Sequence, residues 1–165
     1  AEVPVVIATT FRNLGFNDFT IKINNRKILN GLYESLGQEE NSVEIMRIVD
    51  KLDKIGVEAV KEEISKLGVS SEVTDRIVKF IKIEGSTDEK LQKLEELNIK
   101  NEKYLKGLEE LKEVVKYIRL FKMPEENFTV DLTIARGLDY YTGTVYETFL
   151  NDYRELRKCM LWWKI

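Results

Sequence analysis

The chain has 165 residues, of which 43% are hydrophobic and 33% are charged, and its formal net charge is −3 at pH 7. This composition is typical of a charge-rich protein that folds at least in part, and the negative balance excludes a general electrostatic attraction to nucleic acid. No apolar run approaches the roughly 18 residues that a membrane span needs, and the first residues lack the basic start of a secretory signal, so no membrane association is expected.

Cysteine and histidine usage limits the chemistry further. The single cysteine, Cys159, excludes an internal disulfide and fits a reducing cytosol, so a cytoplasmic location is expected. The chain contains no histidine. A zinc site is therefore not expected, and any metal would be magnesium held by carboxylates.

The first 24 residues predict a helix followed by a strand. Apolar residues recur at helical spacing over residues 1–14, and Gly15 is typical of a helix that ends at a left-handed glycine. Residues 16–24 then alternate apolar and polar side chains, which is the period of a half-buried strand.

Residues 26–121 show helical periodicity almost throughout, with Gly56, Gly68 and Gly85 as expected helix ends. Ser86 and Glu89 have the spacing of a capping box. The helix that they begin is predicted to bury Leu91, Leu94 and Leu97. The longest helix, from about residue 101 to 121, is predicted to bury Leu105, Leu108, Leu111, Val115 and Ile118.

After Pro124 the period changes from helical to alternating. Apolar residues alternate over 128–134, and Val145 and Phe149 follow past a turn, so we predict an antiparallel pair joined near residues 141–143. The expected fold class is α+β, with a mostly helical insertion attached to a partial antiparallel sheet.

The most distinctive stretch, residues 135–147, reads ARGLDYYTGTVYE. Arg136 is a permanent cation whose planar fork can contact a carboxylate and a phosphate oxygen together. The phenols of Tyr140 and Tyr141 can hydrogen-bond to an imidazole and pack on its ring, but a turn is needed for both to line one pocket. Taken alone, an arginine at a strand end and a tyrosine pair are more often ordinary surface and core residues.

This stretch resembles the histidine-binding signature of histidyl-tRNA synthetases, which are class II aminoacyl-tRNA synthetases. Residues 19–31, FTIKINNRKILNG, resemble a strand and helix start of the same family. Residues 52–56, 101–102 and 107–108 resemble its helical insertion. The resemblance covers the chain from residue 1 to about 156.

The resemblance implies a ligase that activates histidine with ATP and Mg²⁺ and transfers it to tRNA(His), acting as a homodimer. It implies that Arg136 is catalytic and binds histidine, and that Tyr140 and Tyr141 bind histidine. Gly137 and Gly143 are expected to allow close backbone approach or a positive φ, with a plain turn as the alternative. Glu147 is a candidate to orient Arg136 or a substrate amine, although we favour a solvated strand carboxylate.

Several family elements are missing from the sequence: the dimer-forming motif, the ATP-binding arginine loop, the final arginine motif and the anticodon domain. The chain is therefore expected to be a fragment that is not catalytically competent alone, holds no cofactor and self-associates through residues 128–149. In the family the insertion is thought to approach the tRNA acceptor arm. Four lysines are candidates for that contact, but a solvated helix face is favoured because glutamates are interspersed: Lys103, Lys106, Lys112 and Lys116.

The expected division is a partial catalytic core at 1–40, a helical insertion at 41–122, a core strand hairpin with the signature at 123–156, and a non-native tail at 157–165. The tail is interpreted as a frame shift. When the codons for Trp162 and Trp163 are read one base later they must encode Gly-Gly, as the family loop expected there requires, whereas the alternative is a genuine amphipathic terminus. The coding DNA distinguishes the two interpretations.

Two other functions stay open on the sequence. One is the synthetase-like regulatory subunit of histidine biosynthesis, which senses histidine without charging tRNA. Arg136 argues against it, because a sensor has no transition-state charge to stabilise. The other is a helical interaction module, which would show no selective binding of histidine.

Overall fold

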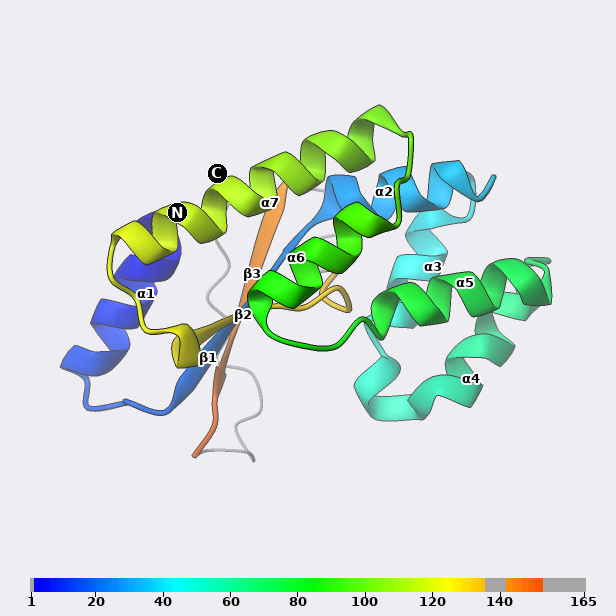
Figure 1. The fold of residues 1–165 in the computed structure, drawn as a ribbon. Helices are drawn as coiled ribbons and strands as arrows, with labels where there is room; N and C mark the ends of the chain where they lie inside the picture. Colours follow the sequence, from blue (N-terminus) through cyan, green and yellow to red (C-terminus); the bar gives the residue numbers. More distant parts are fainter. Residues whose placement is uncertain (1, 136–141, 153–165) are drawn as a thin grey trace.

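The computed structural model describes residues 2–135 and 142–152, which form a small sheet surrounded by helices (Figure 1). The α+β fold class and the mostly helical content are confirmed. In chain order, the elements are α1 (Glu2–Asn13), β1 (Phe19–Asn25), α2 (Arg26–Ser35), α3 (Ser42–Val49), α4 (Leu52–Lys66), α5 (Ser71–Ile81), α6 (Thr87–Glu96), α7 (Glu102–Leu120), the 3-10 helix η1 (Glu125–Asn127), β2 (Phe128–Val130) and β3 (Thr144–Leu150).

The sheet has the strand order β2-β1-β3, with β1 parallel to β2 and antiparallel to β3. The predicted antiparallel pair between residues 128–135 and 145–149 is therefore wrong, and the described sheet is mixed. Alternation identified the strand residues but carries no information on which strands are neighbours. Here β1, more than 100 residues earlier in the chain than β2, lies between the two strands that follow the helical stretch.

One face of the sheet is apolar and is covered by helices. Ile21 and Ile23 of β1, Phe128 and Val130 of β2 and Tyr146 of β3 are buried in the main hydrophobic core. In Figure 1, α7 extends across the sheet from the side of α2 toward α1. The elements α3, α4 and α5 gather beside the sheet, on the side away from α1.

Most of the predicted helix faces agree with the structure, with two exceptions. Leu97, at the end of α6, is 44% exposed, and Leu105 of α7 is 52% exposed. Both lie on helix faces that no neighbouring described element covers, which periodicity alone does not reveal. The residues predicted to be buried on α6 and α7 are otherwise buried: Leu91, Leu94, Leu108, Leu111, Val115 and Ile118.

Helix ends follow local chemistry. The capping box is confirmed, because the Glu89 backbone N–H donates to the Ser86 hydroxyl and the Ser86 N–H donates to the Glu89 carboxylate. Gly15 and Gly68 have positive φ after helices, as expected. Gly56 also has a positive φ, but it kinks α4 internally instead of ending it.

Two glycines allow α2 and α7 to approach closely. A Cβ on Gly107 would lie 2.7 Å from the backbone nitrogen of Ile28, and a Cβ on Gly31 would collide with the backbone of Tyr104. Because any side chain needs more space than this, only glycine permits this crossing distance. The crossing places the middle of α7 beside the end of β1.

Replacing Gly107 with alanine is therefore expected to destabilise the chain. In an unhindered helix, alanine is favoured over glycine by about 1 kcal/mol, but overpacking against the α2 backbone typically costs about 1–3 kcal/mol. Urea unfolding followed by circular dichroism should show a lower midpoint for Gly107→Ala. Lys106→Ala, on the exposed face of the same helix, serves as the control, and a more stable Gly107→Ala variant would contradict the close crossing.

Candidate functional site

The signature residues fall into two groups in the structure. Arg136, Gly137, Tyr140 and Tyr141 lie outside the described residues, so their predicted roles stay predictions. Gly143 and Glu147 are described, as are the residues that lead into the signature. The candidate site is therefore described through two sets of residues: those on either side of residues 136–141, and those on the sheet face that carries Glu147.

Glu147 lies on β3 directly opposite Lys22 of β1, so both side chains project from the same face of the sheet. Glu147 is only 8% exposed. The favoured interpretation of Glu147 as a solvated carboxylate is therefore wrong, because the ends of α3 and α4 approach this face. The alternative role, orienting Arg136 or a substrate amine, stays a prediction.

Gly143 does not have a positive φ, and a Cβ at this position would meet no described atom within 4 Å. Both parts of its prediction are therefore wrong, which leaves the alternative of a plain turn. The Gly143 carbonyl oxygen accepts a hydrogen bond of 3.0 Å from the backbone N–H of Arg26. Its contribution in the structure is thus a backbone acceptor at the point where the chain enters β3.

A partly buried ion pair occupies the same face of the sheet. The ammonium nitrogen of Lys22 lies 2.7 Å from Asp131 Oδ2, and it also lies 4.6 Å from the centre of the Phe149 ring. Thr133 donates to Asp131 Oδ1 from its hydroxyl, at 2.6 Å, and from its backbone N–H, at 3.0 Å. The turn that follows β2 is thus held to β1 by a charge-assisted contact.

The pKa directions follow from these contacts. Burial alone would lower the pKa of Lys22 and raise that of Asp131, but their mutual attraction and hydrogen bonding outweigh burial. The pKa of Lys22 is consequently raised and that of Asp131 is lowered, so both groups are charged at neutral pH.

Lys90 of α6 brings a second cation to this region. Its ammonium donates to the carbonyl of Val130 at 2.7 Å and to the hydroxyl of Thr129 at 3.2 Å. Burial, opposed by Asp131 and reinforced by Lys22, lowers the pKa of Lys90. Lys90 therefore attaches α6 to β2, and its positive charge is also attracted by the carboxylate of Asp131.

The sheet face that carries Lys22, Asn24 and Glu147 is called the polar sheet face. A small cavity lies between this face and the α3–α4 junction. Its volume is about 20 Å³, which suits one water molecule and not an amino acid. Among the described residues, no group of three or more histidine, cysteine, aspartate or glutamate side chains is arranged to hold a metal ion. The cavity is lined by Lys22, Val49, Asp50, Asp53, Thr133, Ile134, Glu147 and Phe149.

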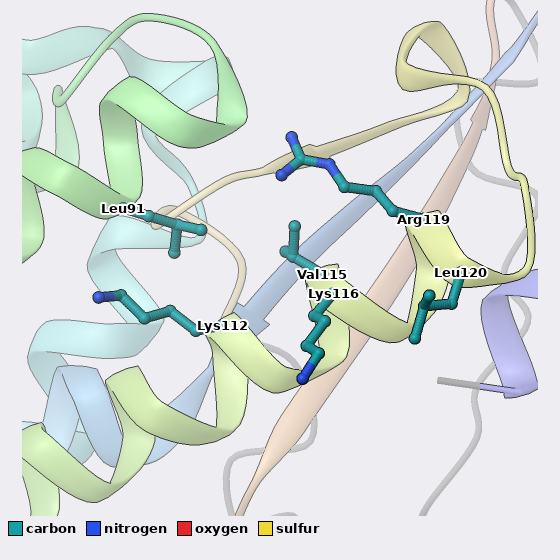
Figure 2. A pocket seen from close by; sticks show the side chains of 6 residues that line it. All are labelled: Leu91, Lys112, Val115, Lys116, Arg119 and Leu120. Carbon is teal, nitrogen blue, oxygen red and sulfur yellow. The ribbon is translucent and has the colours of Figure 1, made fainter.

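A larger open groove of about 380 Å³ lies elsewhere, between α6 and α7 (Figure 2). Leu91 of α6 faces α7, from which the other lining side chains project. Two of the three basic groups there have acidic partners: Lys112 pairs with Glu95, and Arg119 pairs with two carboxylates. The groove is lined by Leu91, Lys112, Val115, Lys116, Arg119 and Leu120.

The lysines considered for tRNA contact are mostly engaged within the chain. Lys103 pairs with Glu34 and Lys106 with Glu109, in addition to the pair formed by Lys112. These pairs fit the solvated, charge-balanced helix face that the sequence favoured. A role in tRNA contact stays a prediction.

Comparison with known proteins identifies the family. Residues 1–156 match the family described as histidyl-tRNA synthetase. This chain belongs to the histidyl-tRNA synthetase family. It is 49% identical over 156 residues to the histidine–tRNA ligase of Clostridium tetani, a match that covers 94% of this chain and 35% of that protein. The chain therefore spans about a third of the length of the curated relatives that it matches.

The structural relatives agree. The crystal structure of histidyl-tRNA synthetase from Nostoc sp. PCC 7120 superposes with a TM-score of 0.92 at 41% identity, covering 95% of this chain and 37% of that one. A protein from Bacillus halodurans, described as an ATP phosphoribosyltransferase regulatory subunit/histidyl-tRNA synthetase, has a TM-score of 0.73 at 21% identity, over 90% of this chain and 38% of that one. The second likeness shows a common fold only.

Within this family segment, sequence reasoning missed the residues of the polar sheet face. Lys22, Asn24 and Asp131 were interpreted only as the polar positions of half-buried strands, which would point to water. Asn24 is in fact fully buried, and Lys22 and Asp131 are paired with each other. The sequence did contain a signal for these buried polar residues. In a short strand, charged and amide residues alternate with fully apolar ones.

The ion pair predicts a pH-dependent contribution to stability. The folded pKa of Asp131 lies below the 3.8 of an unperturbed carboxyl, so its contribution is present above that value and is lost as the pH falls through the folded pKa. Asp131→Asn is expected to lower the free energy of unfolding by about 1–3 kcal/mol at pH 7. The difference from the unsubstituted chain should shrink below about pH 4. Urea unfolding at several pH values measures both effects, with exposed Glu126→Gln as the control; a difference that is independent of pH would refute the assignment.

Proposed function

We propose that the chain is the part of a histidine–tRNA ligase that carries the histidine-recognition signature and the helical insertion. The observation that carries this proposal is the family match over residues 1–156, which includes the whole stretch ARGLDYYTGTVYE. Identities of 41–49% to proteins named as ligases support the ligase over a more distant function.

The proposed chemistry uses Arg136 at the first step. The carboxylate of histidine attacks the α-phosphate of ATP, which brings two anions together, and pyrophosphate leaves. A guanidinium held between them stabilises the charge that concentrates in the transition state. Tyr140 and Tyr141 would select histidine by hydrogen bonds and ring contacts with its imidazole. In a second step, a terminal ribose hydroxyl of tRNA(His) attacks the carbonyl carbon of the histidyl adenylate, so the histidyl group is transferred and AMP leaves.

Catalysis by this chain alone is not part of the proposal. The chain spans about a third of the length of the ligases that it matches, so ATP is proposed to be held by other parts of a full-length ligase. The described residues offer no set of carboxylates that fits Mg²⁺, and no Mg²⁺ ligand is proposed in this chain. No described helix is long and apolar enough to cross a membrane. A cytoplasmic location remains part of the proposal.

The division into a core at 1–40 and 123–156 and an insertion at 41–122 is retained as a proposal. The helix α7, which is the last helix of the proposed insertion, packs closely against α2 of the proposed core segment. Residues 157–165 lie beyond the family match, which supports their interpretation as a non-native tail. These residues are outside the part of the chain that the structure describes.

The regulatory subunit of histidine biosynthesis remains a weaker alternative. Its support is the fold likeness to the Bacillus halodurans protein, at 21% identity. A histidine sensor needs the imidazole contacts but no cation at the phosphate. The presence of Arg136 beside Tyr140 and Tyr141 therefore favours the ligase.

Arg136 gives the deciding experiment. In a full-length ligase that contains these residues, Arg136→Ala is expected to lower kcat for histidine-dependent ATP–pyrophosphate exchange by about 10²–10³-fold, the usual effect of removing a transition-state donor. Arg136→Lys should recover part of the rate because it keeps the charge but not the fork. Exposed Arg76→Ala, on α5, is the control. Exchange that is unchanged in Arg136→Ala would overturn the assignment.

We also propose that the isolated chain self-associates through residues 128–149. In the described sheet β2 and β3 are the outer strands, and outer strands present backbone groups that can pair with another chain. Sedimentation velocity over a range of concentrations should show a sedimentation coefficient that rises with concentration. A compact monomer at every concentration would contradict this proposal.

A further inference from the structure

Three consecutive polar residues are buried where β1 ends and α2 begins. Asn24 and Asn25 are fully buried, and Arg26 is nearly so. Burying polar groups is unfavourable unless they find hydrogen-bond partners. Their partners lie mainly on two segments: residues 131–134, which lead into the signature, and residues 143–144, in its second half.

Asn24 contacts the segment that leads into the signature. Its side-chain nitrogen donates to the carbonyl of Ile134 at 2.8 Å and to that of Leu132 at 3.3 Å. Its side-chain oxygen accepts from the backbone N–H of Asn25 at 2.8 Å. The side-chain amide of Asn24 thus binds two backbone carbonyls in the segment that immediately precedes Ala135 and Arg136. The backbone N–H of Asp131 also donates to the carbonyl of Ile23 at 2.9 Å.

Asn25 and Arg26 contact the second half of the signature, where the chain enters β3. The side-chain nitrogen of Asn25 donates to the hydroxyl of Thr144 at 3.3 Å, and the backbone N–H of Arg26 donates to the carbonyl of Gly143 at 3.0 Å. The same Asn25 nitrogen donates to Glu110 of α7 at 2.8 Å. Asn25 also accepts from the backbone N–H of Lys27, so it caps α2.

We propose that Asn24, Asn25 and Arg26 form a strand-end clamp that sets the separation between residues 131–134, just before the signature, and residues 143–144, in its second half. Asn24 is the positioning residue of this clamp. The inference rests on the proposed function, because its purpose is to place the signature for histidine activation. Positioning matters for rate, since a displacement of about 1 Å can cost about 10²-fold in catalysis.

The chemistry requires asparagine at position 24. Two carbonyl oxygens face the side chain, so the residue must supply two N–H groups from one atom, and it must also accept from the Asn25 N–H. Aspartate has the same shape but would direct a second lone-pair oxygen at the two carbonyls. Serine is smaller and keeps one donor.

The first arm of the experiment measures the clamp in the 165-residue chain. Asn24→Asp is compared with the unsubstituted chain by amide hydrogen exchange and mass spectrometry, following peptides that cover residues 131–135 and 142–146. We expect exchange in the 131–135 peptide to become about tenfold faster, because the closed state of that segment loses the two hydrogen bonds that Asn24 donates. Exchange in the 142–146 peptide should accelerate less, because Asn24 reaches that segment only through Asn25. Peptides from α4 and α5 should be unchanged. Asn41→Asp, whose amide donates to nearby Gln38, is the matched control.

Asn24→Ser keeps the test decisive if Asn24→Asp unfolds the chain. Accelerated exchange confined to these two peptides in the serine variant supports the clamp. Exchange that matches the unsubstituted chain in those peptides, or acceleration spread evenly over all helices, overturns it.

The second arm measures function in a full-length ligase that contains these residues. Asn24→Ser is expected to lower kcat for histidine-dependent ATP–pyrophosphate exchange by about 10–100-fold, with a smaller change in KM, because the misplaced group acts chiefly in the transition state. Unchanged kcat together with altered hydrogen exchange would overturn the positioning role. If the unsubstituted ligase shows no histidine-dependent exchange, the proposed function fails, while the hydrogen-exchange arm still decides the clamp.

Discussion

The central position of β1 is the constraint on which the described structure depends. It forms backbone ladders with β2 on one side and β3 on the other; β2 precedes the signature, and β3 carries its last residues. Its apolar face, with Phe19, Ile21 and Ile23, belongs to the hydrophobic core beneath the helices. Its opposite face carries Lys22 and Asn24. One short strand therefore determines both the core and the placement of the polar residues around the site.

The helical stretch is joined to this strand by a few specific contacts. Gly31 and Gly107 let α2 and α7 pack with almost no separating side chains, which brings Glu110 to the end of β1. There Glu110 accepts from the side chains of Asn25 and Lys27. At the other end of the crossing, Glu34 of α2 accepts from Asn101, which caps α7, and from Lys103 of α7. Contacts at both ends fix the direction of α7 across the sheet.

The polar sheet face shows how a charged site can be supported in a small core. Lys22 and Asp131 form an ion pair, and Thr133 donates a hydrogen bond to the other carboxylate oxygen of Asp131. Lys90 donates a hydrogen bond to a backbone carbonyl of β2. Each charge has a partner, so burial does not neutralise the pair.

The sequence by itself determined the family and most local structure. The signature at 135–147 identified the family, the Ser86–Glu89 spacing fixed a helix start, and periodicity placed α7 to within about one residue at each end. These features depend on residues that are close together in the chain, so they can be predicted from the order of the residues. Alternation also located the strands. It did not state their order, and the inferred hairpin was wrong because β1 lies between β2 and β3.

Only the tertiary structure decided the roles of residues whose partners are distant in the chain. Lys22 and Asn24 looked like solvent-facing strand positions until Asp131, Leu132 and Ile134 were placed against them. Glu147 looked solvated until the ends of α3 and α4 covered its face of the sheet. Burial and pairing are set by contacts across more than 90 residues of chain, and one-dimensional patterns do not encode which side of a strand another element will cover.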